Sequence, residues 1–305
     1  MQQSDLNGIL LINKPQGFTS HDVVAKLRGI LHTRRIGHGG TLDPLATGVL
    51  PVFVGGATRA ADFAAAQDKE YIAGFTLGYN TDTQDVTGGT LQVSGRCAAR
   101  DAVEQAAGRF LGSQKQVPPM YSAVKVNGQK LYDLARRGKA VERPARDITV
   151  HAIDLLEFDE HAQKGMLRLT VSKGTYVRTL INDLGEALGT LAVMHSLTRT
   201  RSGAYTLREC RGFSQVERAA ANGAAQTLLL PTDSLFPLHP AVRLTGEGAE
   251  RIARGAVVFP RMAQGMPETA GALCRVYHGA RFLMLGQVRT LDKGGLGLFV
   301  YKNFG

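Results

Sequence analysis

The sequence predicts an α+β fold, with one large domain built on a mixed or antiparallel sheet and a small β-rich domain at the C-terminus. Segments typical of strands and of helices are interspersed along the chain without a regular strand–helix–strand rhythm. Pro231, Pro237 and Pro240 then interrupt the chain, which marks a domain boundary. A length of 305 residues also exceeds one average domain.

The spacing of apolar residues predicts the individual elements. Short apolar runs, or runs alternating with polar residues, are typical of strands, whereas apolar residues three and four positions apart are typical of helices. Strands are therefore expected over residues 8–12, 71–79, 167–171, 275–277 and 298–301. Helices are expected from an N-cap at Ser20 to Leu31, from Asp101 to Leu111, over 180–188 and over 245–255.

Composition favours a folded protein with a polyanionic partner. The formal net charge is +10, an excess that favours nucleic acid. No apolar run is long enough to cross a bilayer, and residues 1–7 lack the features of a signal peptide, so we expect a cytoplasmic location and no membrane association. The three cysteines are scattered and no metal, nucleotide or redox motif occurs. Neither a metal nor a cofactor is therefore expected.

The most unusual stretch is GHGGTLDPLATG, residues 37–48. Pro44 biases Asp43 away from the α region, so the stretch predicts a loop that presents a carboxylate on a shaped backbone. A basic segment precedes the loop. Asp-Pro and Gly-Gly are also common in ordinary turns, so these residues alone leave the catalytic role of Asp43 open.

A second stretch, SKGTYVRT at residues 172–179, joins a predicted strand to a predicted helix. Lys173 and Arg178 are candidates for phosphate contacts, and Gly174 permits close approach of the backbone. The alternative is an ordinary charged strand–helix junction with Tyr176 in the core.

Together with three further motifs, the two stretches resemble the TruB family, the bacterial tRNA pseudouridine-55 synthases. KPQGFTS at 14–20 matches the opening K-P-x-G-x-[ST]-S motif, and residues 37–48 match the catalytic loop. Residues 117–125 match the start of an RNA-gripping thumb. SKGTYVRTLINDLG matches the second active-site motif, and Leu197–Thr200 matches the L-x-R-x end of the catalytic domain. The five motifs occur in register from residue 8 to about 210.

The resemblance implies a role for each matched residue. Asp43 resembles the catalytic aspartate, Arg178 the arginine paired with it, and Tyr71 a catalytic tyrosine that stacks on the target uracil. The implied substrate-binding residues are His38, which contacts the RNA loop beside the flipped base, and Tyr71, Tyr176, Leu197 and Lys14. For Tyr71 and Leu197 the alternative is an ordinary core position in a strand.

The resemblance also implies the fold. It is a pseudouridine-synthase α+β domain over residues 1–238 with a mixed, mostly antiparallel sheet and a thumb inserted at about 117–145, followed by a PUA-like RNA-binding domain over 239–305. One departure is Val171, where some relatives carry Cys. The family mechanism does not use that thiol.

The function implied is isomerisation of the T-loop uridine of transfer RNA to pseudouridine by base flipping. The expected partner is the T-arm stem-loop of transfer RNA, with no obligatory protein partner. The reaction neither adds nor removes atoms, which agrees with the lack of cofactor motifs. One alternative is a non-catalytic RNA-binding or RNA-folding protein, and a second is the related guide-RNA-dependent class of synthase. A third, a glycosidase, would need a second catalytic carboxylate.

Overall fold

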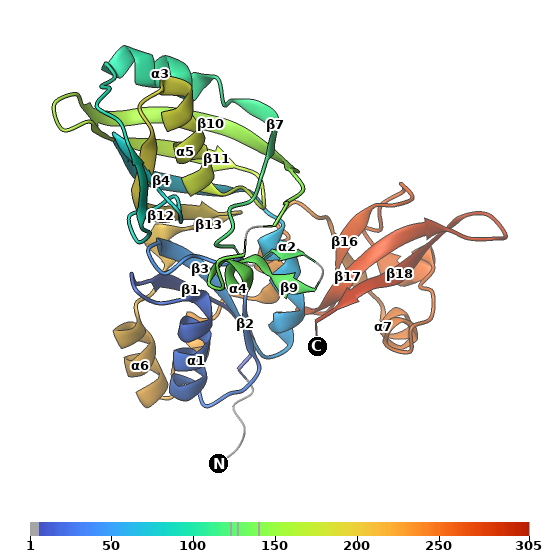
Figure 1. Cartoon of the computed structure of the whole chain (residues 1–305). Helices are drawn as coiled ribbons and strands as arrows, with labels where there is room; N and C mark the ends of the chain where they lie inside the picture. The colour runs from blue at the N-terminus through green and yellow to red at the C-terminus, as the bar shows by residue number, and fades with distance from the viewer. Residues whose placement is uncertain (1–5, 123, 127, 140, 305) are drawn as a thin grey trace.

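The computed structural model describes residues 6–304 except 123, 127 and 140 (Figure 1). Its main body is a nine-stranded sheet whose central order is β1-β3-β12-β4-β11-β10-β7, with β2 paired to β3 and β13 paired to β12. The strands are β1 Gly8–Lys14, β2 Ile36–His38, β3 Thr47–Val54, β4 Lys69–Leu77, β7 Gly112–Gln116, β10 Arg146–Asp159, β11 Lys164–Val171, β12 Ala192–Ser202 and β13 Tyr205–Thr206.

The pairing confirms the predicted mixed, mostly antiparallel sheet. Each of the pairings in this sheet is antiparallel except that of β12 with β3, in which Thr198 faces Thr47 and Arg199 faces Gly48. This parallel contact joins the two halves of the sheet. It also sets β12 directly against the chain that leaves residues 37–48.

Helices pack against the sheet and form separate apolar clusters with it. Val103 of α3 and Leu180 of α5 pack with β4, β10 and β11, and Val23 of α1 and Val216 of α6 pack with β1 and β3. Ile9 and Leu11 of β1 face a third cluster. Both faces of β1 are therefore buried, which explains its continuous apolar run. The helices of the main body outside the thumb region are α1 Ser20–Ile30, α2 Ala61–Ala65, α3 Arg100–Gly108, α5 Val177–Leu188 and α6 Phe213–Ala221.

Each predicted element in these regions is present, with four corrections at element ends. The predicted strand 71–79 is divided, because β4 ends at Leu77 and Tyr79 begins the separate strand β5. The N-cap of α1 is Thr19, whose side chain accepts a hydrogen bond from the Asp22 N–H in a capping box, and not Ser20. Helix α3 ends at Gly108 and does not reach Leu111. Helix α5 begins at Val177, one turn before the predicted start.

The expected thumb region contains two short strands and a short helix. These are β8 Lys125–Val126, β9 Gln129–Lys130 and α4 Leu131–Ala135. Ala123, Asn127 and Ala140 of this region lie outside the described residues. At its base, the Tyr121 hydroxyl donates to Asp82 (3.1 Å) and Arg143 donates to the Pro118 carbonyl (2.9 Å). Asp82 follows another small sheet, β5 Tyr79–Thr81 with β6 Thr90–Val93.

The C-terminal region forms its own five-stranded sheet, which projects to one side of the main body (Figure 1). Its elements are β14 Ala241–Leu244, α7 Gly246–Ala253, β15 Ala263–Gln264, β16 Leu273–His278, β17 Arg281–Thr290 and β18 Leu296–Asn303. Thr245 caps α7 as expected. Leu285 and Phe304 pack into a cluster with Ile9 and Phe53 of the main body, so the two units share apolar core. The PUA-like assignment and the boundary at 238 stay predictions.

Candidate active site

The GHGGTLDPLATG stretch forms a loop between β2 and β3 that is anchored on the N-terminus of α1. The buried Ser20 hydroxyl accepts a hydrogen bond from the Leu42 N–H (2.9 Å) and donates to the Leu42 carbonyl (3.3 Å). Gly17 donates its N–H to the Pro44 carbonyl (2.8 Å). The residues on both sides of Asp43 are thus fixed to the first sequence motif, KPQGFTS. Ser20, which the sequence suggested as a helix cap, instead holds the loop.

Two glycines allow the loop to lie against β12. Gly48 has φ +102°, and a Cβ there would lie 2.2 Å from the Arg199 carbonyl oxygen. Gly40 has φ +107°, also in the region that side chains disfavour. Larger residues at these positions would therefore displace the loop.

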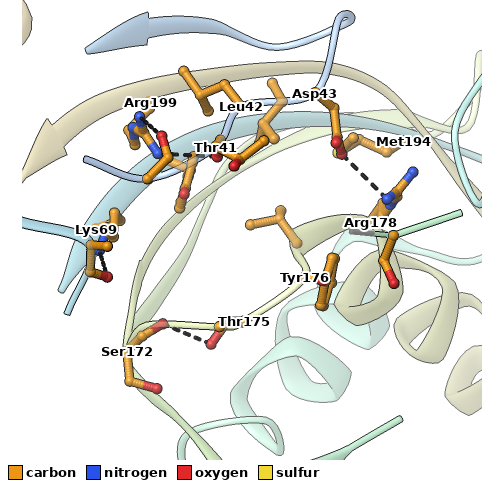
Figure 2. Close-up of a pocket in the computed structure, with 17 residues that line it drawn as sticks. Thr41, Leu42, Asp43, Lys69, Ser172, Thr175, Tyr176, Arg178, Met194 and Arg199 are labelled. Atoms are coloured by element: carbon orange, nitrogen blue, oxygen red, sulfur yellow. Dashed lines mark hydrogen bonds and ion pairs between the residues drawn. The ribbon is translucent and has the colours of Figure 1, made fainter. Parts of the chain in front are cut away.

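Asp43 forms an ion pair with Arg178 at the edge of a pocket (Figure 2). The closest oxygen and nitrogen are 3.3 Å apart, and the side chains are 40% and 6% exposed. The carboxylate is therefore accessible while the guanidinium is nearly buried. The predicted Asp43–Arg178 contact is present in the structure, although 135 positions separate the two residues in the sequence (178 − 43).

Arg178 lies in the first turn of α5 and is held from several sides. It donates hydrogen bonds to the carbonyls of Tyr121 and Thr83, and its second carboxylate partner is Asp85, 3.5 Å away. The Asp85 side chain is 5% exposed and accepts hydrogen bonds from the Thr83 and Thr87 hydroxyls. Arg178 therefore stands between one exposed and one buried carboxylate.

Beside this ion pair is a cavity of about 240 Å³. Tyr71 comes from β4 and Leu197 from β12, which are neighbouring strands, and Met194 and Tyr176 contribute further lining. Tyr71 and Leu197 are 8% and 9% exposed. They belong to the apolar cluster of the sheet and also line the cavity. The two residues therefore occupy core positions that also face the cavity, and their roles toward the uracil stay predictions.

Tyr176 is positioned by a reciprocal amide contact. Its N–H donates to the Gln116 side-chain oxygen (2.8 Å), and the Gln116 amide nitrogen donates to the Tyr176 carbonyl (3.1 Å). Gln116, at the end of β7, is buried. The Arg178 guanidinium carbon lies 5.9 Å from the centre of the Tyr176 ring, and burial raises the pKa of the Tyr176 hydroxyl. The ring is therefore neutral at physiological pH.

Two of the predicted site residues do not line this cavity. His38 lies on β2 with its ring 5.4 Å from that of His21, edge to face. Burial, followed by the charges of His21 and Arg199, lowers the pKa of His38 to about 4, so its ring is neutral at physiological pH. Lys14 is fully buried and donates to the carbonyls of Pro15 and Phe18. It supports the turn between β1 and α1, and its role in substrate binding stays a prediction.

A second cavity, of about 720 Å³, adjoins the first. It shares Asp43 and Arg178 with the first cavity, and the thumb contributes Tyr132 and Arg136. The ion pair therefore stands between a small pocket within the sheet region and a larger space under the thumb.

Sequence patterns did not reveal several features that build the site: Asp85, Gln116, the loop-holding role of Ser20, and the burial of Lys69 and Arg199. Asp85 stands in a mostly polar run, Thr83 to Thr87, that is typical of an ordinary turn. Arg199 was visible inside the L-x-R-x motif, but no pattern indicated which atoms it contacts.

Neither a membrane-spanning helix nor a metal-binding cluster occurs in the described part of the chain. In residues 6–304, the three gaps excepted, no helix has the length and apolar character to span a bilayer. In the same residues, no three His, Cys, Asp or Glu side chains gather closely enough to hold a metal ion.

Curated relatives share much of the sequence. Proteins named tRNA pseudouridine synthase B are 44% identical over 260 residues in Lactiplantibacillus plantarum and 43% identical over 256 residues in Bacillus anthracis. These alignments cover 83% and 82% of this chain and 85% and 83% of the relatives. The relative from Halalkalibacterium halodurans is 42% identical over 284 residues, covering 90% of this chain and 93% of that protein.

Solved structures share the fold. The crystal structure of a Cbf5-Nop10-Gar1 complex contains a chain that is 27% identical, with a TM-score of 0.74, covering 98% of this chain and 85% of that chain. A chain in the structure of an H/ACA RNP bound to a substrate RNA containing 2′-deoxyuridine is 25% identical, with a TM-score of 0.73 and the same coverage.

Family models account for most of the large domain. The TruB family pseudouridylate synthase N-terminal domain matches residues 28–177, and the tRNA pseudouridylate synthase B C-terminal domain matches residues 178–237. Together with the curated relatives, these matches show that the chain is an isomerase that belongs to the TruB family of pseudouridine synthases.

Proposed function

We propose that this chain converts the T-loop uridine of transfer RNA, position 55, to pseudouridine, with Asp43 as the catalytic carboxylate. The observation that carries the proposal is the accessible Asp43 carboxylate, paired with Arg178 at the edge of a cavity lined by Tyr71, Tyr176 and Leu197. The names of the curated relatives support transfer RNA as the substrate. The family supports a stand-alone enzyme in the cytoplasm.

The reaction breaks the N1–C1′ bond, turns the uracil while it is bound, and joins C5 to C1′. An ionised carboxylate can serve as nucleophile at C1′ or as base toward a sugar proton. The Arg178 guanidinium, 3.3 Å away, positions the Asp43 carboxylate by an ion pair. Asp85 holds Arg178 in place from the other side.

The uridine must leave the loop of the RNA before it can enter the cavity. Flipping costs a few kcal/mol of unstacking, and stacking on an aromatic side chain returns about 1–3 kcal/mol per base. Tyr71 and Tyr176 supply aromatic faces in the cavity. We propose that the larger space under the thumb receives the RNA around the flipped base, and that residues 239–305 form a PUA-like RNA-binding domain.

The test is a pseudouridine map of transfer RNA incubated with the purified chain alone. We expect one modified position, in the T loop, without added protein or guide RNA. Tight binding of transfer RNA without pseudouridine would support the alternative of a non-catalytic folding protein. Modification only after addition of a guide RNA and partner proteins would support the guide-dependent class.

Substitutions at Tyr71 should separate stacking from chemistry. Tyr71→Leu removes the aromatic face and should abolish most activity, while Tyr71→Phe keeps the ring and should still flip and hold the base but react slowly. The hydroxyl is a candidate to help remove the C5 proton. Single-turnover kinetics with a fluorescent base-flipping probe measure both steps. Near-normal rates for Tyr71→Leu would restrict Tyr71 to the apolar core.

A further inference from the structure

Three buried cations surround the catalytic loop: Lys14, Lys69 and Arg199 are 0%, 5% and 1% exposed. Among the described residues, none of the three forms an ion pair with a carboxylate within 4.0 Å. Backbone carbonyls are their hydrogen-bond acceptors. A buried charge without an opposite charge is costly. Such a cluster next to a reaction site therefore calls for a functional explanation.

Lys69 and Arg199 are both built into the wall of the small cavity. The Lys69 ammonium donates to the carbonyls of Ala64 (3.2 Å), Ala65 (2.6 Å) and Gln67 around the end of α2. Burial lowers the pKa of Lys69 to about 8, so it still carries its charge at neutral pH. The Arg199 guanidinium donates to the carbonyls of Val49 (2.7 Å) and Gly40 (3.1 Å).

The two cations lie close to the same loop residue. A Cβ at Gly40 would be 3.6 Å from an Arg199 terminal nitrogen and 3.8 Å from the Lys69 Cε. Figure 2 shows Lys69 and Arg199 on the opposite side of the cavity from Arg178 and the Asp43 carboxylate. Asp43 and Asp85 form ion pairs with Arg178, whereas no carboxylate in the described part of the chain lies within 4.0 Å of the Lys69 or Arg199 nitrogens. We name Lys69 and Arg199 the cationic floor.

The proposed reaction creates a matching negative charge. When the N1–C1′ bond breaks, its electron pair stays on the uracil, where O2 and O4 share the charge. This holds if an Asp43 oxygen bonds to C1′, and equally if Asp43 takes the C2′ proton and a C1′=C2′ bond forms. Later C5 bonds to C1′ as the Asp43 oxygen leaves C1′ or, on the second route, as C2′ takes its proton back from Asp43. The C5 proton then leaves and N1 takes a proton. The uracil is thus an anion between bond cleavage and recombination.

We propose that the cationic floor stabilises the uracil anion during bond cleavage. Preorganised positive charge at the place where negative charge develops lowers the barrier, and it acts most strongly where water is excluded. The inference rests on the proposed function of the site. It goes further by giving Lys69 and Arg199 an electrostatic role toward the base, in addition to holding the loop.

The experiment compares two T-arm stem-loop RNAs, with uridine or 5-fluorouridine at the target position. Fluorine at C5 withdraws electrons, so the fluorinated uracil leaves C1′ more readily as an anion. The readout is the single-turnover rate of N1–C1′ cleavage under saturating enzyme. Lys69→Met should slow the uridine substrate by about tenfold or more, somewhat below the effect of losing an oxyanion-hole donor. The same substitution should slow cleavage of the fluorinated substrate by a factor several-fold smaller than the factor for uridine.

Two controls separate this role from loop positioning. Asp85→Asn should also slow cleavage, but by disturbing Arg178 and not the cationic floor. Its rates on the two RNAs give the preference for the fluorinated substrate that any slow chemical step produces. Lys14→Met removes a buried lysine of the same kind that does not line the cavity. We expect the preference for the fluorinated RNA to be larger in Lys69→Met than in either control.

If Lys69→Met and Asp85→Asn show the same preference for the fluorinated RNA, the inference is overturned, and the cationic floor has a structural role alone. If Lys69→Met does not fold, Arg199→Lys and Arg199→Met replace it. Arg199→Lys keeps the charge and should show the same preference for the fluorinated RNA as the controls. Arg199→Met removes the charge and should show a larger preference. Equal preferences in these two variants would again overturn the inference. If the unmodified chain makes no pseudouridine at all, the proposed function fails instead.

Discussion

Asp43→Asn is expected to abolish pseudouridine formation while RNA binding is largely kept. The amide is almost the same size as the carboxylate but is a poor nucleophile and a poor base. The rate of the chemical step should fall on the order of 10³-fold or more, as when a catalytic group is removed from other enzymes. Single-turnover assays and filter binding on the same RNA measure the two quantities.

The fold should tolerate this substitution. The Asp43 side chain is 40% exposed, and pairs of that kind contribute about 0–1 kcal/mol. Arg178 also keeps Asp85 as its buried partner. Thermal unfolding of Asp43→Asn should therefore match that of the parent chain within a few degrees. Turnover close to that of the parent would remove Asp43 from the mechanism.

Strands and helices could be predicted from the sequence where their buried residues recur at the regular spacing of a strand or a helix, or form one unbroken apolar run. β1 is apolar without interruption because two clusters cover its two faces. β10, Arg146–Asp159, was not predicted, because register shifts at Val150/Ala152 and Leu155/Glu157 break its alternation. β3 was also missed. It follows the loop motif without a gap and contains Pro51, which usually argues against an interior strand.

The site was predictable where a motif names a residue, and less so where long-range contacts assign its role. The family resemblance led to Asp43, Tyr71, Tyr176, Arg178 and Leu197, and all five line one cavity. Lys14 belongs to an equally clear motif, yet its side chain is buried beneath the turn that it supports. Asp85 and Arg178 are 93 positions apart in the sequence (178 − 85), and no local sequence pattern predicts their contact.

Arg178→Met should remove both activity and a large part of the stability. Among the residues that the structure describes, its guanidinium is the cation within ion-pair distance of Asp85, whose side chain is 5% exposed. Removing one partner of a buried pair leaves an uncompensated charge, at a cost of about 3–5 kcal/mol. The Asp43 carboxylate would also lose its positioning contact. We expect a lower urea midpoint together with a chemical step too slow to measure.

The double variant Arg178→Met, Asp85→Asn separates the two losses. Replacing Asp85 by the neutral amide removes the orphaned charge, and the Thr87 N–H, which donates to Asp85 (2.9 Å), still finds an oxygen acceptor. Urea unfolding should therefore show the double variant to be more stable than Arg178→Met alone, the mark of coupled neighbours in a double-mutant cycle. Activity should not return, because Asp43 still lacks its arginine. If both variants unfold at the same urea concentration, the buried pair does not carry the stability assigned to it. If activity returns with the stability, Arg178 acts on folding and not on Asp43.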